Sequence, residues 1–426
     1  MSGDVQLGPY SKGINTIDDE RSLDQTGRRD KPAKFLRQAD NVDIDRKGTI
    51  RRRAGYSKLM DLVDSHSLYT TPGGTIFLVE AGQLKSLFLG ALSLTTLTPV
   101  TGPVSYALAH DVVYWTDDYR IGRINRDLVP ESVWTPNPSG TPTVNEAPGV
   151  LHPGLYQVTL TYIGIDGEES GASLATQIQV NQGGITLSDI PQTSDATHIR
   201  VYMTDVNGSV FSRQIDVPMG NTTVTLVNYL DRRRLKTQFA DVMPAGHLLC
   251  FHYGRMYVAV GDTVVWSEAL QPGLTRIQDN HFPPFKGRIQ LMMGSTEGLY
   301  IVDTERTWFM PGGDPEEVKP QSIYPHSGVE GTGVEVPASL LGLKDSGAAP
   351  CWFSDNGMVA GVDGRIVPLT ESQLAVDTYK QGASLYREEQ GIRSIVTSVQ
   401  GKGPGSGLST TDSVSLTHYR NGIDIT

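Results

Sequence analysis

The side chains that could do chemistry are spread along this sequence and form no recognised motif. Nine histidines occur, and only His247 and His252 lie close together, five residues apart around an expected strand start. Residues five apart in a strand face opposite sides of the sheet, so a shared metal ion there is disfavoured. The sequence has no HExxH, CxxC or Gly-x-Ser-x-Gly motif and no phosphate-binding loop. We therefore predict no catalytic, cofactor-binding or metal-binding residue.

Carboxylates are the next candidates for chemistry. Asp117-Asp118 and Glu316-Glu317 fall in expected turns, where solvated side chains are favoured over a general acid and base. Residues 43–48 bear some resemblance to a calcium loop, but Lys47 occupies the place of the third acidic ligand. No glutamate follows at the distance that a bidentate ligand requires. A hairpin turn at Gly48 is the better interpretation, and we predict that the chain is not an enzyme.

The sequence contains two runs of three arginines, and each run has two possible roles. Residues 51–53 form an expected strand, in which the first and third arginines share one face. Residues 232–234 come after a point where the residue pattern of the sequence changes. Such a run either keeps an edge strand from mispairing or docks against an acidic face of a neighbouring subunit. Neither run has the interleaved aromatic residues typical of a surface that binds single-stranded nucleic acid. The candidate subunit-interface residues are Arg51, Arg52, Arg53, Arg232, Arg233 and Arg234.

The composition is typical of a globular chain rich in tight turns. Of 426 residues, 38% are hydrophobic and 19% charged, and there are 46 glycines and 25 prolines. The net charge of −11 argues against a protein that coats nucleic acid through a basic face. It is compatible with a channel through which DNA slides without sticking. Cys250 and Cys351 lie in apolar stretches, which predicts two buried thiols and no disulfide scaffold.

No segment has the pattern of a signal peptide or a membrane span. Residues 1–6 lack a basic region followed by an apolar core. Residues 86–109 are uncharged, but they are rich in serine and threonine and contain Pro99 and Pro103, which favours strands and loops. We expect a protein that is made and folded in a cytoplasm.

A short strand–turn–strand unit recurs, with an aromatic or other bulky residue near the tight turn. Its copies occupy residues 75–82, 112–118, 256–262, 299–303 and 358–364. Repetition at intervals of some tens of residues predicts a fold made of copies, and blades of a β-propeller run about 40–50 residues. At roughly that size, the repeat-bearing regions of the chain provide about six blades. The predicted fold class is all-β, a β-propeller.

A segment with a different residue pattern, 147–230, interrupts the repeats. Residues 155–162 alternate strictly, and Asp166-Gly167 and Asn207-Gly208 mark turns. About seven short strands in roughly 80 residues predict an inserted immunoglobulin- or fibronectin-like β-sandwich. Because this segment has no cysteine pair and no tryptophan, the fibronectin-like form is the better match.

The N-terminal residues predict an extended arm, because they are polar, charge-dense and poor in apolar side chains. One helical turn is expected at 34–39, a hairpin at 41–53 and a longer helix at 371–385. The expected domains are then an arm with the first hairpin (1–56), a first propeller segment (57–146), the inserted sandwich (147–230) and a second propeller segment (231–426).

Three segments of this chain resemble bacteriophage virion proteins. Asn41-Val42-Asp43, Gly48 and Arg52-Arg53-Ala54-Gly55 resemble the hairpin that follows an N-terminal arm and starts a β-propeller in those proteins. Residues 254–268 and 294–312 are similar to blades of phage tail nozzle proteins, also called head-stabilisation or tail tubular proteins. The match is strongest over residues 34–56, and an inserted fibronectin-like domain is also common in phage structural proteins.

The resemblance implies a structural role in the virion without a cofactor. It implies a homo-oligomeric ring, commonly a hexamer, below the portal and adaptor proteins, with tail fibre or tail-tip proteins attached. Duplex DNA would pass through the lumen without specific binding, and assembly would take place in the cytoplasm of the bacterial host. The negative charge fits this expectation, because an electronegative lumen repels phosphates.

Two alternatives remain open from the sequence. The first is a tail-tip or baseplate protein that carries fibres or binds a receptor. The second is a propeller enzyme that cleaves glycans, which a cluster of carboxylates or arginines in one central pocket would favour.

Overall fold

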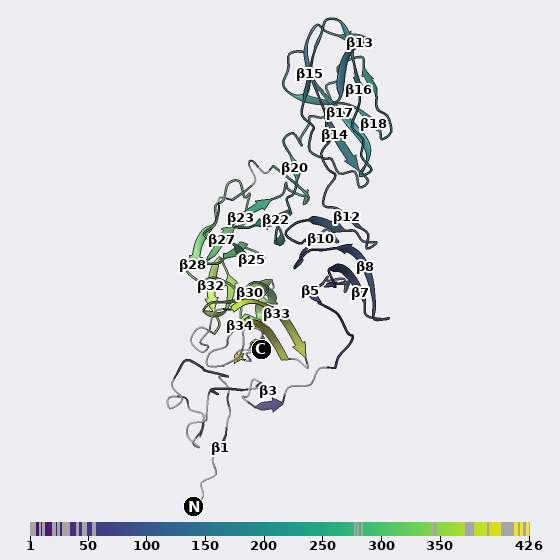
Figure 1. The fold of residues 1–426 in the computed structure, drawn as a ribbon. Helices are drawn as coiled ribbons and strands as arrows, with labels where there is room; N and C mark the ends of the chain where they lie inside the picture. Colours follow the sequence, from purple (N-terminus) through teal and green to yellow (C-terminus); the bar gives the residue numbers. More distant parts are fainter. Residues whose placement is uncertain are drawn as a thin grey trace, which may run out of the picture. The chain divides into compact units, whose positions relative to one another are not determined.

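The computed structural model shows an all-β chain. It describes residues 6–7, 10, 13–18, 23, 26–27, 35–39, 42–44, 49–52, 57–276, 278, 281–282, 284–343, 347–370, 379–389, 392–401, 413–415, 418–420 and 423–425. Within these ranges the structure contains many antiparallel sheets, none closed into a barrel, and one short 3-10 helix, η1 (Ala338–Leu341) (Figure 1). No helix of the described residues is long and apolar enough to span a membrane.

The contacts divide the chain into two compact units. Unit 1 comprises residues 1–61, 261–263 and 284–426, and unit 2 comprises residues 62–260 and 264–283.

Unit 2 begins with two four-stranded sheets in which each strand pairs with the next along the chain. The strands of the first are β5 (His66–Thr70), β6 (Ile76–Glu80), β7 (Gln83–Phe88) and β8 (Ser93–Pro99). The strands of the second are β9 (Ser105–Ala109), β10 (Val112–Thr116), β11 (Ile121–Ile124) and β12 (Pro130–Ser132). A third sheet follows the insert and contains β21 (Leu248–His252), β22 (Arg255–Val260) and β23 (Thr263–Trp266), beside the pair β20 (Asp241–Val242) and β24 (Leu274–Thr275).

The tight turns of the recurring unit are where the sequence predicts them. Ala81 and Gly82 have φ angles of 49° and 69° and connect β6 to β7. Positive φ at both central residues gives a turn whose twist matches that of the flanking strands. The expected strand–turn–strand units at 75–82 and 112–118 are thus confirmed, and so are the strands expected within residues 86–109.

The sheets of unit 2 pack face to face. In β10, Val113 and Trp115 lie in a cluster with Phe77 and Val79 of β6. Tyr114, between them in sequence, lies in a different cluster with Met256 and Val258 of β22. Successive residues of a strand point to opposite faces, so β10 buries both of its faces between neighbouring sheets.

The segment predicted as an insert, 147–230, forms seven strands in two sheets together with residues 143–146 before it, where its first strand begins. Their bounds are β13 (Thr143–Leu151), β14 (Gly154–Gly164), β15 (Thr176–Val180), β16 (Gly183–Ser188), β17 (Ala196–Thr204), β18 (Phe211–Pro218) and β19 (Val224–Leu226). One sheet has the order β13-β16-β19 and the other β15-β14-β17-β18. A single cluster of buried side chains, including Val158, Leu160, Ile185 and Val201, contains residues from both sheets. This cluster contains no tryptophan or cysteine, as the sequence of the segment requires.

Unit 1 contains further sheets of consecutive strands. Two are four-stranded: β25 (Ile289–Gly294), β26 (Gly298–Asp303), β27 (Thr307–Pro311) and β28 (Gln321–Tyr324), then β29 (Val334–Pro337), β30 (Ala348–Ser354), β31 (Gly357–Val362) and β32 (Arg365–Pro368). A third contains β33 (Tyr379–Glu389), β34 (Ile392–Gly401) and β35 (Ser413–Ser415). Three strand pairs are β1 (Gln6–Leu7) with β2 (Thr26–Gly27), β3 (Val42–Ile44) with β4 (Ile50–Arg52), and β36 (His418–Arg420) with β37 (Ile423–Ile425).

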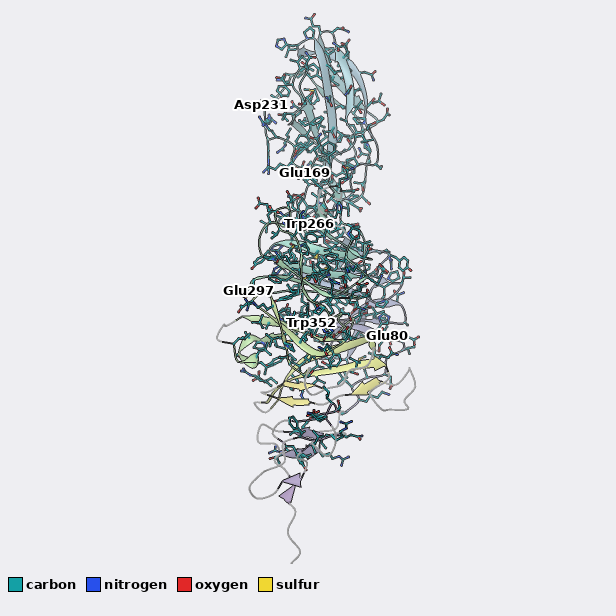
Figure 2. All side chains as sticks on the ribbon, turned by 90° about the vertical axis from the view of Figure 1, so that its left-hand side faces the viewer. Glu80, Glu169, Asp231, Trp266, Glu297 and Trp352 are labelled. Carbon is teal, nitrogen blue, oxygen red and sulfur yellow. The ribbon has the colours of Figure 1, made fainter. Side chains whose placement is uncertain are left out.

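In unit 1, too, a strand is buried on both of its faces. Trp352 of β30 (labelled in Figure 2) is fully buried. It packs with Tyr300 and Val302 of β26. Its sequence neighbours Cys351 and Phe353 lie in another cluster, with residues of β34. Burial raises the pKa of the Cys351 thiol to about 12, so it is a core side chain and no nucleophile at neutral pH. The prediction of two buried thiols holds for Cys351, whereas Cys250 is partly exposed.

Both helix predictions are wrong wherever the structure describes the residues. Residues 379–385 belong to β33, and residues 371–378 lie outside the described ranges. Exposure alternates from Gln381 to Tyr386 with a period of two, which is the period of a strand paired with β34. At 35–39, Leu36 forms a parallel bridge with Ile14 in place of a helical turn. The predicted hairpin is confirmed as β3 and β4, and its turn lies outside the described residues.

A buried aspartate closes the turn after the second strand of one sheet in each unit. Asp303 accepts hydrogen bonds from the backbone N–H of Glu305 and Arg306, both at 2.7 Å, from Lys286 N–H at 3.2 Å, and from Trp308 Nε1 at 2.9 Å. Asp117 accepts equivalent bonds from the N–H groups of Tyr119, Arg120 and Thr101. Each carboxylate therefore closes its own turn and anchors the preceding loop.

We expect Asp303→Ala to lower the free energy of unfolding by about 2–3 kcal/mol, because it leaves several buried N–H donors without an acceptor. Urea unfolding of the full chain measures this loss. The control is Glu305→Ala in the same turn, whose side chain is half exposed and which should change stability by less than about 0.5 kcal/mol. Equal losses in the two variants would contradict the assigned role of Asp303.

Candidate functional site

The first predicted arginine run lies in the hairpin of unit 1. Arg51 and Arg52 are exposed on β4, opposite Asp43 and Val42 of β3. Arg53 lies outside the described residues. The exposure of the two described arginines is compatible with both interpretations, an edge-strand charge and a docking surface.

The second run, residues 232–234, lies on the edge of the inserted module in unit 2. Arg232 donates from Nη1 to the carbonyl of Gln214 at 3.1 Å. The carbonyl of Arg233 accepts from Arg213 N–H at 3.0 Å, and Arg234 forms a bridge with Ser212. The run therefore continues the sheet beyond β18, and its side chains are exposed.

A charged cluster that the sequence did not reveal surrounds Arg123 of β11. The side chain of Arg123 binds three carboxylates: Nε to Glu131 at 2.9 Å, Nη1 to Glu168 at 2.8 Å and Nη2 to Asp166 at 2.9 Å. Arg123 is only 9% exposed. Glu131 belongs to the same sheet as Arg123, whereas Asp166 and Glu168 lie in the turn after β14. One guanidinium thus connects the second sheet of unit 2 to the inserted module.

Neighbouring groups hold the carboxylates of this cluster in place. Thr135 Oγ1 donates to Glu168 at 2.9 Å, and Asn125 Nδ2 donates to Glu131 at 2.6 Å. Burial alone would lower the pKa of Arg123, but its hydrogen bonds and charge interaction with Glu168, together with Glu131, raise it instead. The guanidinium is therefore charged at every relevant pH, and its ion pairs form a permanent connection.

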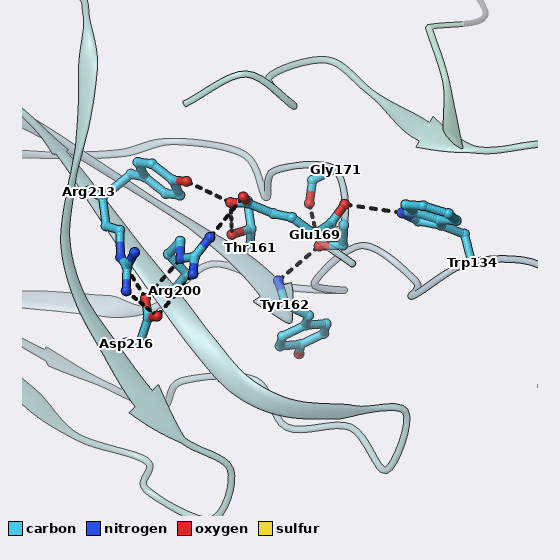
Figure 3. A network of polar contacts seen from close by, with 10 residues as sticks. Trp134, Thr161, Tyr162, Glu169, Gly171, Arg200, Arg213 and Asp216 are labelled. Carbon is cyan, nitrogen blue, oxygen red and sulfur yellow. Dashed lines mark hydrogen bonds and ion pairs between the residues drawn. The ribbon is translucent and has the colours of Figure 1, made fainter. Parts of the chain in front are cut away.

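A second network begins at the next residue of the same turn. Arg200 of β17 binds Asp216 with two hydrogen bonds, at 2.8 and 3.0 Å, and Glu169 at 3.0 Å (Figure 3). Glu169 also accepts from the hydroxyls of Tyr202 and Thr161, at 2.6 and 2.8 Å. Its backbone carbonyl accepts from Trp134 Nε1 at 3.1 Å. Glu168 therefore binds the module to the second sheet of unit 2, whereas the Glu169 carboxylate connects strands within the module and only its carbonyl reaches Trp134.

Two hollows flank this turn. The larger, of about 780 Å³, is lined by residues that include Trp115, Tyr119, Arg123 and Asp166. Tyr119 is 73% exposed, so an aromatic ring is available at this hollow. The lining of the smaller, of about 240 Å³, includes Glu169, Arg200, Arg233 and Arg234.

The cluster of Arg123, Glu131, Asp166 and Glu168 holds the inserted module to the second sheet of unit 2, and we call it the Arg123 clamp. Each of its three carboxylates accepts a hydrogen bond from the same guanidinium, so one cation holds all three side chains together. Among the described residues, no group of three histidine, cysteine or carboxylate side chains is arranged to hold a metal ion. His247 and His252 lie in the region of β21, as the sequence suggests.

A weak signal for Arg123 was present in the sequence. Ile121–Ile124 is a short strand with an arginine between apolar residues, and the insert carries the acidic turn Asp166-Gly167-Glu168-Glu169. Neither feature is unusual alone. Their pairing spans more than 40 residues, which no local pattern reveals.

Comparisons with known proteins do not assign the chain to a family. No family model and no curated protein matches the chain. Among solved structures it is similar to the computationally designed Ika8 protein, with 8% identity over 79% of this chain and 95% of that one and a TM-score of 0.26. The N-terminal domain of Nup159 has 10% identity over 92% and 88% and a TM-score of 0.30. Dipeptidyl peptidase 4 of Porphyromonas gingivalis has 9% identity over 93% and 56% and a TM-score of 0.25. Likenesses this weak do not bear on function.

We expect Arg123→Met to destabilise the protein by about 3–5 kcal/mol, because it leaves Glu168 and its neighbours as poorly compensated charges. Urea unfolding, followed by tryptophan fluorescence, measures the loss. Arg126→Met is the matched control, since Arg126 pairs with Asp111 on the exposed surface and should matter by less than about 0.5 kcal/mol. If both variants unfolded at the same urea concentration, the clamp assignment would be wrong.

The Arg200 network predicts a pH dependence. Burial alone would raise the pKa of Asp216, but hydrogen bonds and charge interactions with Arg200 and Arg213 outweigh it and lower the pKa below 3.8. Its stabilising contribution is therefore complete above pH 3.8 and disappears as the pH falls through the folded-state pKa. At pH 7 we expect Asp216→Asn to be less stable by about 1–3 kcal/mol.

Unfolding curves for wild type and Asp216→Asn, measured between pH 7 and pH 2.5, test this dependence. The gap between the two should narrow below pH 3.8. Asp195→Asn, in an exposed turn, serves as the control and should follow the wild type. A gap that stays constant down to pH 2.5 would refute the role of Asp216.

Proposed function

We propose that this protein is a structural component of a bacteriophage tail, of nozzle type, in the virion. The proposal rests on the resemblance of residues 34–56, 254–268 and 294–312 to that family. The observation that carries it is a series of consecutive antiparallel sheets, interrupted by one inserted module, in which the strands β10 and β30 bury both faces against neighbouring sheets of their own unit. Such an architecture presents large surfaces and is suited to subunit contacts.

We infer that the consecutive sheets are blades of a β-propeller. Six sheets of three or four strands follow one another outside the insert in the described residues of the chain, beginning at β5, β9, β21, β25, β29 and β33. About six blades is the number that the sequence predicts. In blades, as here, neighbouring sheets pack face to face. The arm and the hairpin of β3 and β4 would then reach a neighbouring subunit.

The inserted module fits a fibronectin-like β-sandwich in its seven strands and its common core. In the proposed tail its role is to decorate the ring or to meet a fibre or tail-tip protein. The Arg123 clamp supports this role, because ion pairs between the module and the second sheet of unit 2 resist its displacement under load.

The proposed ring, commonly a hexamer, would sit below the portal and adaptor proteins and extend the DNA channel. Its assembly would take place in the cytoplasm of the bacterial host. Each copy adds a net charge of −11, and negative charge along a lumen keeps duplex DNA from binding as it passes.

A tail-tip or baseplate protein is the second candidate, and the 780 Å³ hollow favours it. Tyr119, Trp115 and Trp134 line this hollow together with charged groups, which suits the binding of a receptor. The glycan-cleaving alternative has less support, since the carboxylates of the hollow that surround Arg123 are held by its guanidinium.

The assembly state of the purified protein tests the proposal. We expect light scattering after size exclusion to give a closed oligomer, and negative-stain images to show rings with a channel wide enough for duplex DNA. Mass spectrometry of virions from a phage that encodes the chain should detect it in stoichiometric amounts. A persistent monomer that is absent from virions would overturn the proposal, and a protein found at the tail tip without a ring would favour the second candidate.

A further inference from the structure

The side chains that line the smaller hollow of unit 2 carry more positive charge than the carboxylates around them neutralise. Its lining includes Arg200, Arg233, Arg234 and Lys236, against the carboxylates of Glu168 and Glu169. Both carboxylates already have partners: Glu168 binds Arg123, and Glu169 binds Arg200. Arg200 is further neutralised by Asp216. The charge balance of the hollow is thus decided by the other three cations.

Those three cations have no counter-ion among the residues that the structure describes. Arg233, Arg234 and Lys236 are exposed, and no described carboxylate lies within ion-pairing distance of their side chains. The segment that carries them is ordered by the sheet, because Leu235 N–H donates to the carbonyl of Phe211 at 3.0 Å and the carbonyl of Arg233 accepts from Arg213. The charges therefore project from a fixed backbone in a chain whose net charge is −11.

We propose that this hollow is an oxyanion-binding site. Arginine side chains bind carboxylate and phosphate oxygens through paired N–H donors, and a lysine adds a compact charge. A hollow of about 240 Å³ has room for one or two oxyanion groups. Arg232 is excluded from the site, because its guanidinium is bound to the Gln214 carbonyl. The second arginine run, residues 232–234, is thereby divided into a structural arginine and two binding arginines.

The oxyanion has two sources with the same chemistry. One is a free phosphate-type ion. The other is an acidic turn of a second copy of this chain: Asp314, Glu316 and Glu317 are exposed in the loop between β27 and β28. A turn on one copy that enters a hollow on the next is a head-to-tail contact, the kind that closes rings. This second source rests on the proposed ring, whereas the first does not.

Calorimetric titration at low salt tests the site with two probes, inorganic pyrophosphate and a peptide of residues 311–320. We expect the full-length wild type to bind at least one of them. The triple variant Arg233→Ala, Arg234→Ala, Lys236→Ala should bind it at least tenfold more weakly, and the charge-conserving Arg233→Lys, Arg234→Lys should lose less. Arg126→Ala controls for loss of an exposed arginine elsewhere in the unit, and circular dichroism confirms that each variant is folded.

The outcomes separate the sources. Binding of pyrophosphate alone assigns a free anion, and binding of the peptide above a scrambled control assigns the second copy. For the second copy, the double variant Glu316→Lys, Glu317→Lys should weaken oligomer formation. Adding Arg233→Glu, Arg234→Glu and Lys236→Glu to it should restore the oligomer. Unchanged affinity in the triple variant, or no binding of either probe, would overturn the inference. A wild type that binds the probes but never forms a ring would instead count against the proposed function. Tighter binding of duplex DNA than of either probe would also overturn the inference.

Discussion

Burial on both faces of the central strands is the constraint on which this structure depends. Trp352 faces one neighbouring sheet while Cys351 and Phe353 face another, and Tyr114 and Trp115 are divided in the same way. Each large apolar side chain fully removed from water contributes about 1.5–3 kcal/mol. A sheet with two apolar faces would expose both of them if it stood alone, and one of them if it had a single neighbour. The sheets are therefore stable as a series, and each requires its neighbours.

The polar groups add specificity to this apolar series. Asp117 and Asp303 satisfy the N–H groups of tight turns that no strand partner could reach, and they bind the preceding loop as well. Because buried N–H donors are costly without an acceptor, these carboxylates determine where each turn lies. In these two turns the aspartate accepts hydrogen bonds from the backbone and so has a structural role.

The inserted module depends on a different kind of interaction. Its own core is apolar and separate, but charged groups on one turn bind it to the second sheet of unit 2 and brace its own outer face. Partly buried ion pairs of this kind are strongly directional, and they lose much stability when one partner is removed. The module is therefore suited to hold a defined orientation on that sheet. Arg233, Arg234 and Lys236, beside the same turn, do not belong to this network, and their exposed side chains can contact a partner.

The sequence by itself determined the all-β class, the positions of the recurring strand–turn–strand units and the seven strands of the insert. These are local properties, because alternation and turn residues such as Ala81-Gly82 act within a few residues. It failed at 379–385, where strand pairing with β34 overrides helix propensity. Only the tertiary structure decided that Arg123 meets Asp166 and Glu168. It also decided that the Arg232 side chain is bound, while those of Arg233 and Arg234 have no counter-ion among the described residues. The physical reason is that ion pairs form between residues far apart in the chain, once the apolar faces have fixed which strands are neighbours.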